Sequence, residues 1–207
     1  MKNFKQLIYL ILVILINCRN DESPSATNNP PNPEQGEDLS QYIYKGCNGF
    51  VEFNSNDKSF LLYLRSIGVD KNGDTKISCS EAQAVTEIDF GDRGAVSNIE
   101  GIEAFSNLKK ISGAIKYPSN GNKTVLNLYN NNKLEEIDFS NYIITGTNGG
   151  LTTVANGAIH TIVLPNMSTL KKMTITHSYF EDLKNTQKQV NLEYLNLDNA
   201  GVKGNLD

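Results

Sequence analysis

The sequence predicts an α/β repeat fold: a solenoid of short parallel strands with an irregular convex side, preceded by a small helical cap. An apolar pattern recurs five times after residue 84, and an amphipathic segment precedes it. Hydrophobic residues make up 39% of the 207 and charged residues 20%, enough for a packed core. The net charge of −4 excludes an overall basic field for nucleic acid. Two histidines and three cysteines leave little material for a multi-ligand zinc or iron–sulfur site.

Residues 1–17 are expected to be an export signal. Lys2 and Lys5 precede the apolar run 7–16, whose ten residues would cover about 15 Å as a helix, half of a bilayer core. The run ends at Cys18, and the letters LINC resemble the lipobox of bacterial lipoproteins. That resemblance implies a lipid anchor on Cys18 and attachment to the outer membrane, on its periplasmic or cell-surface side. An ordinary secretory signal with a coincidental cysteine is the alternative.

Residues 18–40 are predicted to be a disordered tether. The segment after Cys18 holds four of the six prolines, is rich in asparagine and has no aromatic residue. It cannot bury enough apolar surface to fold. Membrane contact is therefore expected through the anchor only.

Residues 41–84 are predicted to form the helical cap. The segment 57–66 has helical periodicity, with Asp57 as its N-cap and Gly68 as its stop. The apolar face expected to be buried is Phe60, Leu61, Leu64 and Ile67.

Residues 70–81 resemble the calcium loop of EF-hands and the shorter loops of dockerins. Oxygen-bearing residues fall at alternating positions, so that a curled loop could bring them around one ion. The expected ligands are Asp70, Asn72, Asp74, Lys76 through its carbonyl, Ser78 and Glu81. Thr75 takes the place that the EF-hand turn gives to glycine, where positive φ is strained for a β-branched residue. An ion-free turn that caps a helix starting near Ser80 is the alternative.

Cys47 and Cys79 are the pair that remains once Cys18 is assigned to lipid. An exported domain sees an oxidising environment, which favours a disulfide over two buried thiols.

The repeated pattern, L-x-x-L-x-L with other apolar residues allowed, begins at residues 85, 108, 134, 170 and 192. Three of the four steps, 23, 26, 36 and 22 residues, lie in the range of leucine-rich repeats. The long step contains 145–157, which we expect to be an insertion loop. Segments 125–128 and 159–164 are expected to return along the convex side. The repeats would occupy 85–207 in about five units, and no polar cap is visible at the end, so the C-terminal end is either truncated or covered by a partner.

The chain is similar to leucine-rich-repeat surface lipoproteins of Bacteroidetes, with an EF-hand-like or dockerin-like loop before the repeats. The residues that carry the similarity are the loop from Asp70 to Glu81, the segment Ile99-Glu100-Gly101-Ile102 and the repeat start Asn107-Leu108. The resemblance covers residues 57–207. It implies binding of proteins or glycans, with calcium as a candidate ion.

Residues between the apolar positions of each strand should point to the open, concave face. Their charges alternate from one repeat to the next, which favours a self-neutralising ladder over a charged patch. The candidate binding face is Lys110, Glu136, Lys172 and Tyr194, with Tyr142 and Tyr179 just after strands.

The sequence has no G-x-S-x-G, H-E-x-x-H or phosphate-loop motif, so we expect no enzyme activity. The function predicted is non-catalytic recognition of a protein or glycan at the cell surface. A calcium-dependent structural or assembly module, and the N-terminal fragment of a larger surface enzyme, are the alternatives.

Overall fold

The computed structural model describes residues 38–91, 96–115, 124–140, 143–147, 150–154, 159–176, 179–198 and 200–202. The chain divides into one unit that ends at Leu39 and another that spans Ser40–Asp207, and every described helix and strand belongs to the second. The expected signal, Cys18 and nearly all of the expected tether lie outside the described residues. Within the described part, no helix is long and apolar enough to cross a bilayer.

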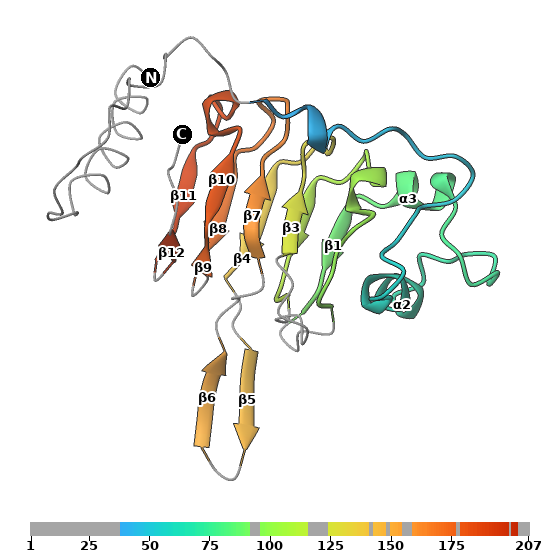
Figure 1. The fold of residues 1–207 in the computed structure, drawn as a ribbon, viewed down its shortest axis with the longest axis horizontal. Helices are drawn as coiled ribbons and strands as arrows, with labels where there is room; N and C mark the ends of the chain where they lie inside the picture. Colours follow the sequence, from blue (N-terminus) through green and yellow to red (C-terminus); the bar gives the residue numbers. More distant parts are fainter. Residues whose placement is uncertain are drawn as a thin grey trace, which may run out of the picture. The chain divides into compact units, whose positions relative to one another are not determined.

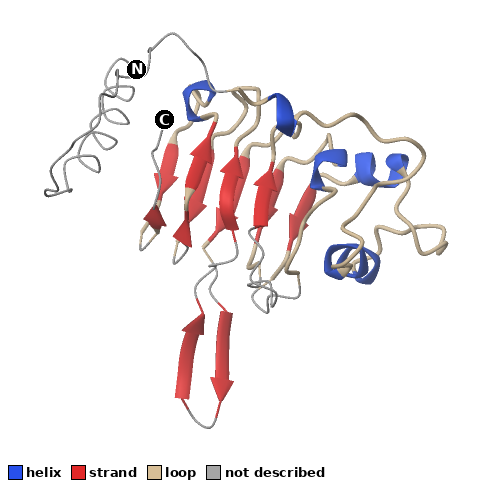
Figure 2. Ribbon diagram, in the orientation of Figure 1, coloured by secondary structure: helices blue, strands red, loops and turns tan. Residues whose placement is uncertain are grey.

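The second unit is a parallel-strand α/β structure with few helices (Figures 1 and 2). Its helical elements are η1 (Ser40–Tyr42), α2 (Ser59–Ser66), α3 (Cys79–Ala84), η2 (Ile102–Ala104) and η3 (Thr186–Lys188). Its strands are β1 (Glu87–Asp89), β2 (Lys110–Ser112), β3 (Thr124–Asn127), β4 (Glu136–Phe139), β5 (Ile143–Thr147), β6 (Gly150–Val154), β7 (Ile159–Val163), β8 (Lys172–Ile175), β9 (Tyr179–Phe180), β10 (Asp182–Lys184), β11 (Tyr194–Asn196) and β12 (Gly201–Val202).

The strands of the five apolar repeats form one parallel sheet in the order β1-β2-β4-β8-β11. Their register aligns the fourth position of every repeat: Ile88, Ile111, Ile137, Met173 and Leu195. The first four of these side chains are buried, because they point inward from the same side of the sheet. The predicted parallel pairing of successive repeats is confirmed.

Each repeat is joined to the next by the same set of backbone hydrogen bonds. The carbonyl of Thr86 accepts the N–H groups of both Lys109 and Lys110, at 2.7 and 3.2 Å. The carbonyls of Lys109, Glu135 and Lys171 each accept the corresponding pair from the following turn. At each step between repeats, one carbonyl oxygen therefore accepts hydrogen bonds from two consecutive N–H groups.

A second parallel sheet, in the order β10-β7-β3, contains both segments that the sequence predicts as convex returns. The sequence did not predict β10, which pairs with β7 from Asp182 opposite Thr161 to Lys184 opposite Val163. A further parallel pair, β9 with β12, extends the same arrangement. The segments between the repeat strands are thus more regular than expected.

The insertion expected to be a loop contains a hairpin. Strands β5 and β6 pair antiparallel, with Ile143 opposite Val154 and Thr147 opposite Gly150. The correction has a local cause, because the segment is rich in β-branched residues, which favour extended backbone over a flexible loop.

Gly113 explains why the second repeat lacks an apolar residue at its sixth position. Its φ is +100°, and a Cβ there would lie 2.6 Å from the backbone nitrogen of Gly91. The turns approach closely at this point, where the N–H of Ala114 donates to the carbonyl of Gly91. Only glycine combines this φ with this contact.

Helix α2 begins two residues later than the predicted cap. Lys58, and not Asp57, is the flanking residue, while the Asp57 carboxylate still accepts the N–H of Ser59 at 2.9 Å. Phe60 and Leu64 are buried as predicted. Ile67 is 47% exposed, contrary to the prediction, because the helix ends at Ser66 and Gly68 turns the chain at a φ of +77°.

Phe60 joins the cap to the first repeats. Its ring lies 5.9 Å from the rings of both Phe90 and Phe105 and 5.7 Å from that of Phe53. These contacts make the helical cap and the repeats one continuous core.

Candidate functional site

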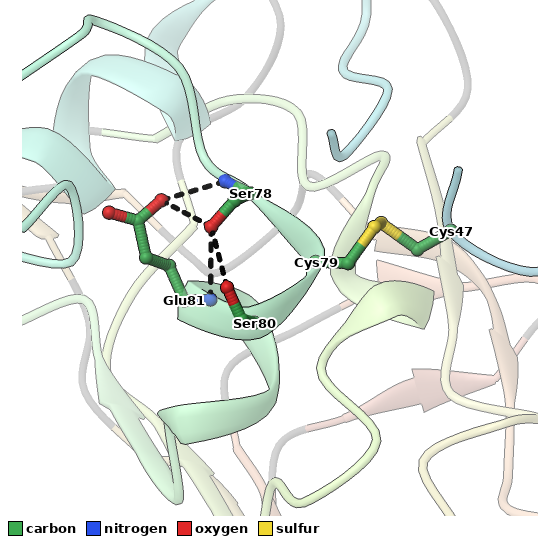
Figure 3. Close-up of a disulfide and its surroundings, with 5 residues drawn as sticks. All are labelled: Cys47, Ser78, Cys79, Ser80 and Glu81. Atoms are coloured by element: carbon green, nitrogen blue, oxygen red, sulfur yellow. Dashed lines mark hydrogen bonds between the residues drawn. A yellow bond between two sulfur atoms is a disulfide. The ribbon is translucent and has the colours of Figure 1, made fainter. Parts of the chain in front are cut away.

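The loop before α3 ends in a reciprocal cap (Figure 3). The Ser78 hydroxyl accepts the N–H of Glu81, and one Glu81 carboxylate oxygen accepts both the N–H and the hydroxyl of Ser78. The other Glu81 oxygen accepts the N–H of Lys71 at 2.7 Å. The side chain predicted at position 12 of a calcium loop therefore holds the two ends of the loop together.

The other predicted ligands bond to the loop's own backbone. Asp70 accepts the N–H groups of Gly73 and Thr75, at 2.8 and 3.0 Å. Asn72 accepts the N–H of Asp74, and Asp74 accepts that of Lys76, each at 2.9 Å. Side-chain oxygens at alternating positions thus curl the loop through successive Asx turns.

Thr75 has a φ of +72°, the left-handed conformation that the EF-hand pattern assigns to glycine. The loop keeps this turn although a β-branched residue is strained there. In the described part of the chain, no group of three or more His, Cys, Asp or Glu residues is arranged to hold a metal ion.

The capping interaction of Glu81 on α3 makes the stability of the fold depend on pH at low pH. Hydrogen bonds from Ser78, and then from Lys71, lower the pKa of Glu81 from 4.5 to about 2. A lowered pKa stabilises the fold above pH 4.5, and this contribution is lost as the pH falls towards 2. We therefore expect the difference in unfolding free energy between the wild type and Glu81→Gln to shrink between pH 4.5 and 2. Denaturant titrations at pH 7, 4.5 and 2.5 measure it, and a difference that stays constant would contradict the assignment.

Cys47 and Cys79 form a disulfide, with their Cα atoms 5.7 Å apart (Figure 3). Two backbone hydrogen bonds join the same two segments. The N–H of Cys79 donates to the carbonyl of Gly49, and the N–H of Val51 donates to that of Ile77. The bridge ties the N-terminal segment to the first residue of α3.

The open face of the five-stranded sheet carries a row of side chains from one position of each repeat. This sheet-face row, in register, is Glu87, Lys110, Glu136, Lys172 and Tyr194. The Lys110 and Lys172 ammonium groups lie 3.3 and 2.9 Å from the same carboxylate oxygen of Glu136. The predicted pairing of opposite charges between neighbouring strands is confirmed.

A parallel row one residue earlier is paired in the same way. The ammonium of Lys171 lies 2.6 Å from a carboxylate oxygen of Glu135. Its hydrogen bond and charge lower the pKa of Glu135, and the Glu135 carboxylate in turn raises the pKa of Lys171. The hydrogen bond from Lys172 likewise lowers the pKa of Glu136. These shifts favour the charged forms of Glu135, Glu136 and Lys171 at neutral pH.

The aromatic residues predicted for this face are only partly described. Tyr194 lies at the end of the row with 49% of its surface exposed. Tyr179 lies in β9, outside the five-stranded sheet, and Tyr142 falls outside the described residues. The structure therefore brings four of the six predicted face residues, Lys110, Glu136, Lys172 and Tyr194, into one row.

Sequence reasoning missed one acidic member of this face. Asp138 lies on β4 beside Lys172, with 3.8 Å between the carboxylate and the ammonium. Glu87, at position 3 of the first repeat, begins the row as the alternating pattern predicts. The alternating pattern lies at positions 2 and 3 of each repeat, whereas Asp138 lies at position 5, which points to the same face of the strand as position 3.

No protein-family model matches the chain, and no curated protein matches its sequence. A solved structure with similarity is an internalin, InlF, from Listeria monocytogenes strain 4b F2365. The two share 16% sequence identity over 71% of this chain and 57% of that one, with a TM-score of 0.27. The chain thus spans little more than half of that protein's length.

Proposed function

We propose that the chain is a leucine-rich-repeat solenoid, anchored to a membrane through Cys18, that binds a protein partner on the open face of its five-stranded sheet without catalysis. The observation that carries the proposal is the sheet-face row, in which five repeats present one position each on one exposed surface. Repeat proteins commonly bind through such a face. Tyr194 is the one aromatic residue of the row, which favours a protein over a glycan because sugars usually need several stacking rings.

The ion pairs along the row hold its charges in place before binding. Each exposed pair contributes less than about 1 kcal/mol to stability. Their main contribution is to preorganise the binding surface. The pairs with Glu135 and Glu136 already restrict the rotamers of Lys171 and Lys172, so that a partner loses less side-chain entropy on binding. Complementary charges then give specificity and a faster association rate more than raw affinity.

Inverting the row tests the proposal. The triple variant Lys110→Glu, Glu136→Lys, Lys172→Glu keeps the two ion pairs of position 136 but reverses the sign at each position. It loses only the longer contact, of 3.8 Å, between Lys172 and Asp138. We expect stability within about 1 kcal/mol of the wild type and at least a tenfold loss of affinity for partners found in a protein display and glycan array screen.

Glu52→Lys, a single charge reversal at an exposed residue of the N-terminal segment, is the matched control and should bind as the wild type does. Unchanged binding by the triple variant would remove the row from recognition. If only the glycan array gave hits, the partner would be a carbohydrate and the proposed protein partner would be wrong.

The membrane anchor is tested separately, because Cys18 lies outside the described residues. Radiolabelled palmitate should label the wild type in cells and should not label Cys18→Ala. Labelling that persisted in the variant would place the lipid elsewhere.

A calcium-dependent structural module is the second candidate. It is favoured by Thr75, whose left-handed φ keeps the turn that a calcium loop needs at this position. Calcium should then release heat on titration into the wild type, and Thr75→Gly should bind more tightly because the strain is removed. No heat with the intact protein would remove this candidate.

A further inference from the structure

A cavity of about 450 Å³ lies where the cap meets the first repeat. Its walls come from the residues just after α2, from α3 and from the start of β1. The volume falls within the range of about 300–1,000 Å³ that is usual for ligand sites. The cavity adjoins the sheet face, because Glu87 belongs both to its wall and to the sheet-face row.

Part of the cavity lining is aliphatic. Val69 is buried, Val85 is half-buried, and Ile67 presents nearly half of its surface. The exposure of Ile67, which the sequence predicts as core, thus adds apolar surface to a concave site. An extended aliphatic chain would bury this surface and gain its hydrophobic contribution.

Two carboxylates and one ammonium belong to the lining residues: Glu81, Glu87 and Lys71. Glu81 is held in position by its bonds to Ser78 and Lys71. Glu87 is exposed and makes no ion pair among the described residues, because Lys110, its neighbour in the row, lies against Glu136 instead. The formal charge of the lining is therefore −2 + 1 = −1, with Glu87 available to a ligand.

We propose that this cavity binds an arginine or lysine side chain of the protein partner, with the aliphatic stem on Ile67, Val69 and Val85 and the cation against Glu87. Long basic side chains combine the two properties that the cavity offers, an apolar stem and a charged end. This inference rests on the proposed function and names the partner's chemistry at the cap end of the same face. The negative charge of the chain as a whole agrees with a basic partner.

The test uses N-acetyl-arginine N-methylamide as the probe and its citrulline counterpart as the neutral isostere. Titrated into the ¹⁵N-labelled protein, the arginine compound should shift the amide signals of Val69, Lys71 and Glu87, with a dissociation constant on the order of 1 mM. Signals from β7 and β10 should not move. The citrulline compound should bind at least fivefold more weakly.

Matched variants assign the effect to residues. Glu87→Gln should weaken arginine binding at least fivefold, whereas Glu193→Gln, the same change at the other end of the sheet face, should leave it unaltered. Lys71→Gln should tighten it, because a competing cation is removed. Equal binding of both compounds, wild-type affinity in Glu87→Gln, or no gain in Lys71→Gln would each overturn the proposal.

The small probe reports on the cavity whether or not the sheet-face row binds a partner. Arginine binding together with an inactive row would contradict the proposed function and leave the cavity assignment standing. Failure of arginine binding with an active row would do the reverse.

Discussion

Replacing both Cys47 and Cys79 by serine is expected to lower the free energy of unfolding by about 3–4 kcal/mol. The disulfide closes a separation of 32 residues, and the chain-entropy model gives this magnitude for such a loop. The closed loop contains α2 and the whole segment from Asp70 to Ser78. Without the bridge, the unfolded chain gains freedom while the native contacts around Phe60 remain.

Urea titration of the double variant, followed by circular dichroism, measures the loss. The double variant is preferable to either single one, which would leave a free thiol able to form new disulfides. Wild-type protein treated with a reductant should match the variant, since both lack the same cross-link. A change below about 1 kcal/mol would mean that the backbone bonds of Val51 and Cys79 alone restrict the segment.

The strand positions were predictable because the inward residues of each repeat recur with the same local spacing. Ile88, Ile111 and Ile137 align in the sheet as they align in the sequence. The charge pairing was predictable for the same reason, since fixed register places Lys110 beside Glu136. Local spacing and register need no knowledge of distant packing.

The hairpin β5–β6 was missed although its signal is local. Two β-branched runs flank the dipeptide Asn148-Gly149, which is a strong hairpin signal. The composition of 145–157, rich in Gly, Thr and Asn, favours a loop, whereas the residue pattern within it favours a hairpin.

The cavity and the buried amides were not predictable, because they depend on contacts between turns. Asn131 and Gln189 each lie three residues before a repeat start, and each donates its amide to carbonyls of the preceding turn. The helical periodicity of the sequence places Ile67 on the apolar face, but α2 ends one residue earlier, at Ser66. Ile67 lines the cavity because of where α3 and β1 lie, which the local sequence does not show.

Replacing Ile137 by alanine is expected to cost about 4 kcal/mol, while Leu195→Ala at the equivalent position should cost about 1–2 kcal/mol. Truncation of a fully buried aliphatic side chain loses its transfer free energy and leaves a cavity in the core. Ile137 is fully buried in β4, between β2 and β8. Leu195 is only half-buried in β11, the last strand of the sheet, where it has one neighbouring strand.

The contrast tests whether the turns share one core. In a stack whose stability is a sum of turns and their interfaces, a central defect weakens two interfaces and an end defect weakens one. We therefore expect Ile137→Ala to lower the midpoint of a single urea transition strongly, and Leu195→Ala to lower it less while hydrogen exchange accelerates in β11. Ile111→Ala, also fully buried between two strands, is the matched control and should behave as Ile137→Ala does. Equal costs at positions 137 and 195 would show that the repeats do not stabilise one another through this shared apolar row.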